Sequence, residues 1–439
     1  MKLSIPDYAK KTIDELFKNG YRAYFVGGCV RDALLCRKPA DWDIATNARP
    51  EQVGSIFPKH FDTGIKHGTV TVLQDGGAVE ITTFRIDHDY TDNRHPGSVE
   101  FSDSFETDVK RRDFTINALG YNESEGIVDY VGGLDDLKNG IIRCVGEPDV
   151  RFREDALRIL RALRFSSVLG FRIDDETFHS VIKNKQLLSE ISAERIRAEI
   201  EKMFAGGSCT PLIHVCDVLF PELYKCFFCD QDNPYHIYNV GMHCLKAADC
   251  AEGGASVKYA ALFHDIGKPS VKTVDENRVA HFYSHALFSE ELARDIFNRL
   301  KLDNKTKKEA LRLIKYHDRV FENTTKSVRR FLSKTDGDFF KKLLELKRAD
   351  VKAQNPKYTK QRLEDIDKTS EILDEVLSAD DAFSLKDLAV NGRDIVELGA
   401  KNAQIRFVLN RLLTAVIDNP RLNEREKLLE LAKNIINCH

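Results

Sequence analysis

The sequence predicts an α+β fold in which a small mixed-sheet domain precedes a long all-helical region. Up to about residue 140, short β-branched runs bounded by polar turns alternate with helical patterns, and the expected strands are DIAT, GTVTVLQ, AVEITTFRI and SVEFS. From about Asp149 onward the strand pattern fades, and apolar residues follow the helical period in segments such as SEELARDIFNRLKL. This change of period divides the chain into a sheet-containing first part and a helical second part.

The length of 439 residues exceeds what one ordinary hydrophobic core organises, so we expect more than one domain. The pattern predicts a sheet-containing domain over residues 1–140. Three helical regions are expected to follow, over residues 141–205, 206–355 and 356–439.

Composition excludes several classes of protein. The net charge of −3 argues against indiscriminate coating of nucleic acid, although basic residues cluster at Lys110–Arg112 and again between Arg151 and Arg164. No apolar run reaches membrane-spanning length, so no membrane partner is expected. Ten cysteines without a repeated spacing indicate reduced thiols and predict a cytoplasmic location. The isolated pair Cys226 and Cys229 is interpreted as ordinary thiols, because a structural zinc site needs four ligands.

The stretch YFVGGCVRDALLCRKPADWDIAT combines features that suit a triphosphate. Gly28 follows an expected strand and precedes an expected helix, so its backbone can approach phosphate oxygens, and Arg31 can pair with a phosphate. Asp41 and Asp43 are two residues apart, which places both carboxylates on one side of an extended strand. Such a pair suits Mg²⁺ bound together with substrate oxygens. The alternative is a solvated loop that carries two acidic residues.

The stretch KRRDFTINALGY offers a second group of candidates. Arg112 can hold a phosphate, and Asp113 can accept a hydrogen bond from a ribose hydroxyl at the start of an expected helix. The alternative is a helix start that Asp113 caps, with a solvated basic flank.

The stretch RFREDALRILRALRF predicts one helix on which Asp155 and Arg158 are three residues apart and share a face. An aspartate that accepts from an amino group and an arginine that donates to a ring nitrogen would select cytosine and adenine over uracil and guanine. The alternative, which this stretch alone favours, is a surface salt bridge that contributes little stability.

The first half of the chain resembles the class II tRNA nucleotidyltransferases, the CCA-adding enzymes. Five motifs occur in the order of that family: GGCVRD…DWD, RRDFTINAL, VDYVGGLDDLKNGIIR, REDALRILRALRF and SAERIRAEI. The resemblance implies a nucleotidyltransferase head over 1–140 and a nucleotide-reading helical neck over 141–205. It implies that Asp41 and Asp43 are catalytic and bind Mg²⁺. The implied nucleotide-binding residues are Gly28, Arg31, Arg112, Asp113, Glu154, Asp155, Arg158, Arg161 and Arg164.

This chain departs from the family pattern at a few positions. Cys36 stands where the family usually has glycine, at the turn into the strand of Asp43. His95 stands where a second arginine is common, in a full-length loop that the family associates with the switch from C to A addition. Near the C-terminus, Asn402-Ala403 replaces a usual Gly-Pro and Arg406 a usual glycine, in helices that resemble the family's tRNA-contacting C-terminal region.

The second half resembles an HD domain, through the segments NVGMHCLKAADC, AALFHDIGKP, HFYSHALFSEELA, LIKYHDR and LKRADVKAQNP. The resemblance implies one or two divalent metal ions held by His243, His264, Asp265, His285, His317 and Asp350. Mixed imidazole and carboxylate ligands suit manganese, iron, nickel, cobalt or zinc. An HD site of this kind predicts hydrolysis of phosphate esters. His236 is interpreted as structural.

The sequence as a whole therefore predicts template-independent addition of CCA to tRNA from CTP and ATP, with an HD phosphohydrolase site on the same chain. The alternatives are a tRNA nucleotidyltransferase that adds only A, a poly(A) polymerase, and an HD phosphohydrolase whose head only binds tRNA. The segment DTGIKHGTVTV is closer to the CCA-adding enzymes than to the bacterial poly(A) polymerases, whose corresponding segment is more basic.

Overall fold

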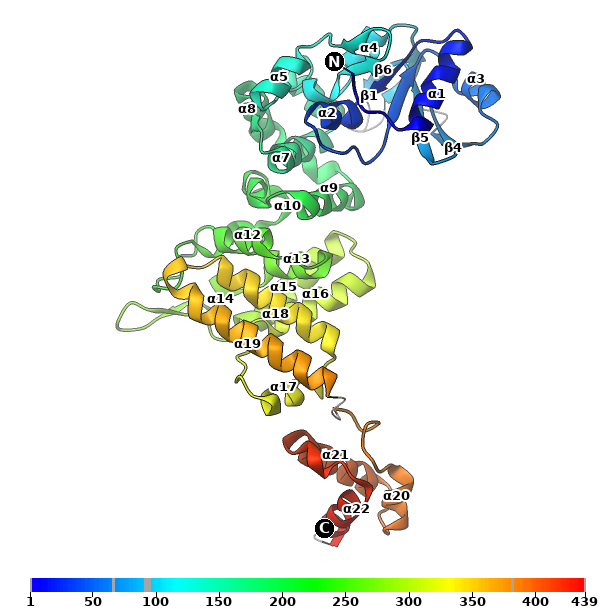
Figure 1. The fold of residues 1–439 in the computed structure, drawn as a ribbon. Coiled ribbons are helices and arrows are strands. Elements are labelled where there is room, and N and C mark those ends of the chain that lie inside the picture. The colour runs from blue at the N-terminus through cyan, green and yellow to red at the C-terminus, as the bar shows by residue number, and fades with distance from the viewer. Residues whose placement is uncertain (1, 65–67, 91–95, 380–382, 438–439) are drawn as a thin grey trace. The chain divides into compact units, whose positions relative to one another are not determined.

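The computed structural model describes residues 2–64, 68–90, 96–379 and 383–437, and it divides into two compact units, Met1–Pro221 and Glu222–His439 (Figure 1). The sheet lies in the first unit and long helices dominate the second, so the predicted α+β class is confirmed. The finer boundaries at residues 140, 205 and 355 stay predictions. Among the described residues, no helix is both long enough and apolar enough to cross a membrane.

A mixed sheet organises the first unit. Its strands lie in the order β3-β4-β5-β2-β1-β8-β9. Central strand β2 pairs antiparallel with β1 and parallel with β5, and in the second pair Asp43 lies opposite Glu80. The bounds are β1 (Ala23–Val26), β2 (Asp43–Thr46), β3 (His60–Gly64), β4 (Thr69–Gln74), β5 (Gly77–Thr83), β8 (Gly120–Asn122) and β9 (Gly126–Val128). The fully apolar burial of β1 fits its place in the middle of the sheet.

The predicted strand AVEITTFRI is two strands, because Phe84 interrupts it. Phe84 is fully buried, its N–H donates to Thr46, and its carbonyl accepts from Ser102, so it joins two sheets. Beyond it, β6 (Arg85–Tyr90) pairs with β7 (Pro96–Phe101) in a separate hairpin. Residues 91–95 of the predicted switch loop, including His95, lie outside the described residues.

Helices surround the sheet and continue beyond it to the end of the first unit. Helix α1 buries Ala9, Ile13 and Leu16 of its apolar face. The bounds are α1 (Asp7–Lys18), α2 (Gly28–Leu34), α3 (Pro50–Ile56), α4 (Phe105–Lys110), α5 (Gly133–Asn139), α6 (Pro148–Glu154), α7 (Leu157–Leu169), α8 (Asp175–Asn184), α9 (Ala193–Gly206) and α10 (Cys216–Leu219). Short strands β10 (Ile141–Ile142) and β11 (Arg172–Ile173) pair beside α7.

Two predicted helices differ from the structure. The helix expected after Asp113 is only a 3₁₀ turn, Thr115–Asn117, before β8 begins. The helix expected from Arg151 to Phe165 is broken at Asp155, whose φ of −144° and ψ of 101° are extended. There the Asp155 carboxylate accepts the Leu157 N–H at 3.1 Å, as a capping side chain does. An aspartate in a helical pattern therefore starts a second helix here.

The second unit is built from antiparallel and crossing helices with buried apolar faces. Its central members are α12 (Val240–Cys250), α13 (Ala255–Phe263), α15 (His285–Arg299), α16 (Asn304–Tyr316), α18 (Gly337–Lys352) and α19 (Thr359–Ser378). Shorter elements are α11 (Pro221–Cys226), α14 (Lys268–Val271), α17 (Thr325–Leu332) and the hairpin of β12 (Thr273–Val274) with β13 (Ala280–His281). Helices α12, α13 and α18 pack against one another, and α16 packs against α13 and α18 (Figure 1).

The last helices have a small core of their own. They are α20 (Gly392–Glu397), α21 (Ala403–Asp418) and α22 (Arg425–Asn437), and Val408, Leu412 and Leu428 are buried among them. Asn402, which replaces a glycine of the family pattern, has a φ of +48° immediately before α21. With a ψ of −121°, this conformation lies outside the left-handed helical region that asparagine tolerates, so the replacement leaves backbone strain at the turn.

Cys36 also occupies a backbone conformation that favours glycine. Its φ is +57°, and its side chain is exposed at the turn between α2 and β2. Because Cys36 replaces a usual glycine here and carries a Cβ, its backbone is strained in this left-handed conformation.

We predict that Cys36→Gly stabilises the head. The left-handed strain of about 1–2 kcal/mol on a non-glycine residue exceeds the extra entropy that glycine loses on folding, so the net gain is about 1 kcal/mol. Trp42, the single tryptophan of the chain, is buried in the same domain and reports its unfolding by fluorescence in urea. Cys36→Ala keeps the strain and should leave the midpoint unchanged. Equal midpoints for the glycine and alanine variants would contradict the prediction.

Candidate active sites

Three carboxylates meet at one end of the parallel pair β2 and β5. Asp43 begins β2, Asp41 lies two residues before it, and Glu80 lies opposite Asp43 on β5. Trp42, between the two aspartates, points to the other side and is buried. Its ring packs edge-on against Phe25, with the two ring centres 5.1 Å apart. The period of two in extended chain thus directs both aspartates outward while tryptophan anchors the segment.

The crowding of these acids is visible in their pKa values. Burial, followed by the negative charges of Asp41 and Glu80, raises the pKa of Asp43 to about 7. Burial and the charge of Asp41 raise the pKa of Glu80 as well. Divalent cations relieve such repulsion, and an all-oxygen donor set suits Mg²⁺. Glu80 was missed by the sequence analysis, where its only signal was an acidic residue inside the apolar run AVEITTF.

Asp41 and Asp43 line a cavity of about 650 Å³ that is rich in arginine. Gly28 and Arg31 of α2 line it, as does Arg112, which pairs with the buried Asp108 at 2.9 Å. Arg31 donates to Asn117 at 2.6 Å and pairs with Asp32 at 2.8 Å. These bonds hold the guanidinium groups in place before any anion binds.

Phe165 of α7 forms a platform for three arginines in the same cavity. The guanidinium carbons of Arg31, Arg161 and Arg164 lie 5.0, 5.3 and 3.9 Å from the centre of its ring. Stacking on an aromatic face favours arginine over lysine and keeps these like charges in fixed directions. No sequence pattern indicated this role of Phe165, because an apolar residue on a helix normally indicates only packing.

Asp113 contacts Arg161, and its carboxylate accepts hydrogen bonds from the protein itself. Its Oδ2 accepts from Arg161 Nε at 2.8 Å, and its Oδ1 accepts from the Phe114 N–H at 2.8 Å and from Asn117 at 3.2 Å. Burial raises the pKa of Asp113, but the charge and hydrogen bonds of Arg161 outweigh it and lower the pKa to about 2. A permanent carboxylate therefore fixes Arg161, and its predicted contact with ribose stays a prediction.

The predicted base-reading residues are near one another, but they do not pair as the sequence suggested. Asp155 Oδ2 accepts from Arg195 of α9 at 2.8 Å, while Arg158 donates to Glu154 at 2.8 Å and to the Arg111 carbonyl at 3.0 Å. Arg158 is 9% exposed, so the alternative of an ordinary surface salt bridge between it and Asp155 is wrong. Both side chains line the head cavity, together with Arg164, which pairs with Glu199 at 2.5 Å.

A second cluster lies in the other unit, where six predicted metal ligands come from five helices or their ends. His243 lies on α12, His264 and Asp265 follow α13, His285 begins α15, His317 ends α16, and Asp350 lies on α18. His243 Nε2 is 3.0 Å from Asp350 Oδ1, and His264 Nε2 is 3.3 Å from Asp265 Oδ2. Side chains far apart in the sequence therefore converge on a buried centre.

The histidine rings of this cluster are oriented for metal binding. The Nδ1 atoms of His264, His285 and His317 lie 2.8, 2.7 and 2.7 Å from the carbonyls of Ala261, Phe282 and Ile314. An Nδ1–H that donates to a carbonyl leaves the Nε2 lone pair directed at the centre. Within the described ranges, His243 Nε2, His264 Nε2 and Asp265 Oδ1 are buried without a hydrogen-bond partner. These unsatisfied atoms and the mixed donor set fit one or more divalent transition-metal ions.

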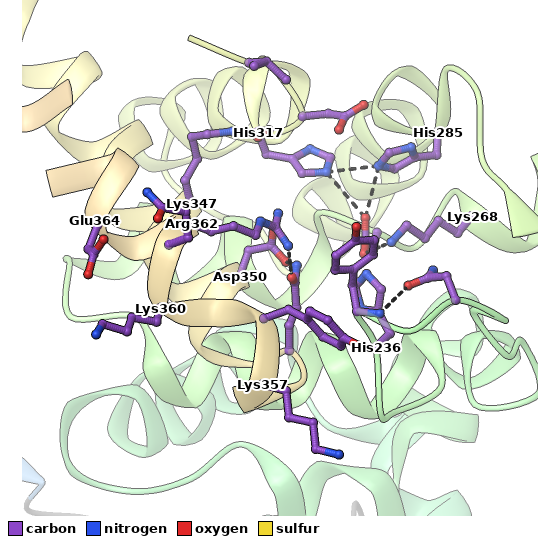
Figure 2. Close-up of a pocket in the computed structure, with 18 residues that line it drawn as sticks. His236, Lys268, His285, His317, Lys347, Asp350, Lys357, Lys360, Arg362 and Glu364 are labelled. Carbon is purple, nitrogen blue, oxygen red and sulfur yellow. Dashed lines mark hydrogen bonds and ion pairs between the residues drawn. The ribbon is translucent and has the colours of Figure 1, made fainter. Parts of the chain in front are cut away.

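The cluster opens into a cavity of about 920 Å³ (Figure 2). Lys268, Lys347 and Arg362 line it close to the histidines, and Lys357 and Lys360 extend at its edge. Sequence analysis missed these cations, because lysine and arginine on helices are usually solvated. His236 also lines the cavity, where burial and the nearby charge of Lys268 lower its pKa to about 3, so the ring is neutral at neutral pH.

Comparison with known proteins agrees with both sites. The model of the Poly A polymerase head domain matches residues 23–143. The model of the probable RNA and SrmB- binding site of polymerase A matches residues 170–226, and the HD domain model matches residues 235–373.

Curated relatives match about half of the chain. A CCA-adding enzyme of Geobacillus thermodenitrificans is 54% identical over 194 residues, which are 44% of this chain and 48% of the relative. A CCA-adding enzyme of Ligilactobacillus salivarius is 49% identical over 225 residues, which are 51% of this chain and 55% of the relative. The alignments thus span about half the length of these curated relatives.

A solved structure matches nearly the whole chain. The Bacillus stearothermophilus CCA-adding enzyme in complex with CTP is 30% identical, with 98% of this chain and 97% of that chain covered at a TM-score of 0.75. The Thermotoga maritima CCA-adding enzyme, complexed with tRNA, is 20% identical with a TM-score of 0.57 and shares the fold. The fold and the sites define a nucleotidyltransferase that carries an HD domain. The chain belongs to the family of CCA-adding enzymes.

Proposed function

We propose that this protein adds the CCA sequence to tRNA 3′ ends, with CTP and ATP as substrates. The observation that carries the proposal is the pair Asp41 and Asp43 on an arginine-lined cavity, with Glu80 opposite Asp43 in the sheet. The near full-length likeness to a CCA-adding enzyme in complex with CTP supports it, and relatives with this name disfavour the poly(A) polymerase alternative. The cytoplasmic location expected from the cysteines stays a prediction.

In this proposal the carboxylates of Asp41 and Asp43 hold Mg²⁺, with Glu80 close by. When bound, magnesium activates the attacking tRNA hydroxyl and stabilises the leaving pyrophosphate. Arg31 and Arg112 pair with triphosphate oxygens, and Arg161 and Arg164 extend the positive wall along α7. Because Phe165 and the acids behind these arginines fix their directions, the triphosphate meets a preorganised field.

Asp155 and Arg158 select the base in this proposal. The Asp155 carboxylate accepts from the amino group of cytosine or adenine, and the Arg158 guanidinium donates to the neighbouring ring nitrogen. Both groups already hold protein partners, namely Arg195 and Glu154. Base binding therefore exchanges one set of charge-assisted hydrogen bonds for another.

The decisive experiment uses tRNA that lacks one, two or three terminal nucleotides. Each substrate is incubated with one labelled nucleotide at a time, and the products are sequenced. Addition of C, C and A in turn supports the proposal. Addition of A alone, only to tRNA that already ends in CC, would favour the enzyme that adds only A.

We predict that Asp41→Ala or Asp43→Ala lowers nucleotide transfer on the order of a thousandfold, because the lost metal site stabilises several kcal/mol of transition-state charge. Binding of tRNA, measured by filter retention, should stay near that of the unmodified protein, since tRNA affinity depends on basic contacts. Asp75→Ala, an exposed change in the β4–β5 turn, is the matched control. Transfer near the normal rate in either site variant would eliminate the proposed metal-binding role of Asp41 and Asp43.

We predict that Asp155→Ala relaxes discrimination against UTP and GTP by about 1–3 kcal/mol, because it removes a half-buried acceptor that only cytosine and adenine satisfy. The ratio of kcat/KM values for CTP and UTP measures the change. Since Asp155 also caps α7, Asp155→Asn provides a comparison that keeps a capping oxygen but alters the hydrogen-bond pattern toward the base. Unchanged selectivity in both variants would show that Asp155 is only a cap.

A second candidate function belongs to the HD cluster. Six candidate ligands converge there, and Lys268, Lys347 and Arg362 surround them, which is suitable for a phosphate ester. We propose that the site hydrolyses phosphoesters, including 2′,3′-cyclic phosphates at damaged RNA ends. A tRNA with a cyclic phosphate has no free 3′-hydroxyl to extend, so one chain would repair and extend the same substrate.

We predict that His264→Ala with Asp265→Ala stops hydrolysis of a cyclic phosphate in the presence of manganese or nickel, while CCA addition to intact tRNA continues. Asp350→Asn should have the same effect with less disturbance of the buried ion pair between Asp265 and Lys268. The first measurement is metal content after purification without chelator. If the protein carries no metal and hydrolyses no cyclic or 2′-phosphate when ions are added, the HD domain is only a helical scaffold.

A further inference from the structure

We propose that Tyr235 and Tyr358 form a subsite that stacks a nucleobase beside the HD cluster, so that its substrate is the phosphorylated 3′ end of an RNA strand. This inference deepens the proposed phosphohydrolase function and rests on it. The cavity of about 920 Å³ has the size of a site for a ligand larger than a phosphate group. The walls away from the histidines indicate what the rest of that ligand is.

The two tyrosines form an exposed aromatic pair that lines the cavity. Their ring centres are 5.2 Å apart and their planes are inclined at 67°, which is an edge-to-face contact. Tyr235 is 49% exposed and Tyr358 is 43% exposed, so a large part of each ring is open to a ligand. Open aromatic rings of this kind bind unpaired nucleobases by stacking and tolerate any of the four bases.

Asn355 connects the backbones of both tyrosines. Its N–H donates to the Tyr235 carbonyl at 2.8 Å, its side-chain amide donates to the Pro234 carbonyl at 2.9 Å, and its own carbonyl accepts from the Tyr358 N–H at 3.0 Å. Asn355 follows α18, the helix that carries Asp350. The aromatic pair is therefore fixed relative to the cluster before a ligand binds, which lowers the entropy that binding costs.

The aromatic pair lies within the reach of one nucleoside from the cluster. His236, which follows Tyr235 in the chain, packs edge-on against His243 of the cluster, with the two ring centres 5.0 Å apart. Consecutive Cα atoms are only about 3.8 Å apart, so the step from the histidines to the first tyrosine is short. A base stacked on the tyrosines can therefore belong to the same nucleotide as a phosphate at the histidines.

Two exposed lysines continue the cavity wall next to Tyr358 (Figure 2). Lys357 precedes this tyrosine in the 3₁₀ turn Pro356–Tyr358, and Lys360 lies in the first turn of α19. In the part of the chain that the structure describes, neither ammonium group pairs with a carboxylate. Asp318 and Glu364 line the same cavity, but with the two carboxylates of the cluster they are outnumbered by five cationic side chains.

The position of these lysines favours an RNA strand over a free nucleotide. Ammonium groups beside a stacked base can bind the phosphodiester groups of the nucleotides that precede it. A mononucleotide whose phosphate lies at the histidines has no further anionic group for them. The cavity therefore offers a place for the terminal phosphate, for its base and for the strand that leads to it.

The test measures stacking and hydrolysis separately. Tyr235→Leu with Tyr358→Leu removes both rings but keeps apolar side chains, and Tyr235→Phe with Tyr358→Phe keeps both rings as the matched control. Hydrolysis is measured in manganese with adenosine 2′,3′-cyclic phosphate and with the same cyclic phosphate on a ribose that lacks a base. Stacking is measured with 2-aminopurine riboside 3′-phosphate, whose fluorescence falls when its base stacks. The head is the same in every variant, so a difference between variants reports the HD cavity.

We expect the parent and the phenylalanine variant to prefer the nucleoside over the abasic substrate by about tenfold in kcat/KM, with the difference in KM. The leucine variant should lose this preference and the fluorescence quenching, hydrolyse the abasic substrate at the parent's rate, and still add CCA to tRNA. Hydrolysis of both substrates with equal kcat/KM by the parent, or an unchanged preference in the leucine variant, overturns the subsite alone. Quenching that needs both rings, without hydrolysis of either substrate, overturns the proposed function alone.

A second comparison separates an RNA strand from a free nucleotide. A trinucleotide that ends in a 2′,3′-cyclic phosphate should have a lower KM than the mononucleotide at low salt, because the lysines bind its phosphodiester groups. Lys357→Gln with Lys360→Gln should remove most of this advantage and leave the KM of the mononucleotide unchanged. Equal KM values for the two substrates in the parent would overturn the choice of an RNA end.

Discussion

Repulsion between carboxylates held together by the sheet is the constraint on which the rest of the head depends. The parallel register of β2 and β5 brings Glu80 opposite Asp43, and Asp41 shares the same side. The sheet hydrogen bonds and the anchored Trp42 keep these groups close despite their like charge. Such a cluster is more stable with cations bound, so the architecture prepares a place for metal and polyanion together. The arginines of α2 and α7 supply the opposite field a short distance away.

The two candidate metal centres use different chemistry on one chain. The head offers only carboxylate oxygens, which suit a hard ion such as magnesium, whereas the HD cluster mixes imidazole nitrogens with two carboxylates. A cell that supplies both kinds of ion can therefore load the two centres separately. Because the proposed reactions act on the same kind of RNA end, this separation lets hydrolysis and extension proceed without competition for a metal.

Site residues could be predicted from the sequence where their side-chain directions depend on the spacing of neighbouring residues in one strand. Asp41 and Asp43 are two residues apart, and extended geometry alone directs both to one side. Glu80 was not readable in this way, because its place beside Asp43 depends on the pairing of strands that are distant in the sequence. Lys347 was hidden for a similar reason, since its partners are backbone carbonyls that carry no sequence signature. The six HD candidates were identified from resemblance, and their convergence required the packing of five helices.

The misread helix between Arg151 and Phe165 shows the limit of periodicity and has a consequence for nucleotide selection. Its apolar residues keep the helical period across Asp155, but an aspartate can begin a helix as readily as it can lie within one. One Asp155 oxygen now secures the first turn of α7, and the other holds Arg195. If the carboxylate turns toward a nucleobase, the first turn of α7 loses its cap, at a cost of about 0.5–2 kcal/mol. Selection of a base and the length of α7 are thus coupled. A mismatched base cannot replace the hydrogen bonds that Asp155 would lose. With such a base, α7 therefore stays intact and the Asp155 carboxylate stays turned away from the nucleotide.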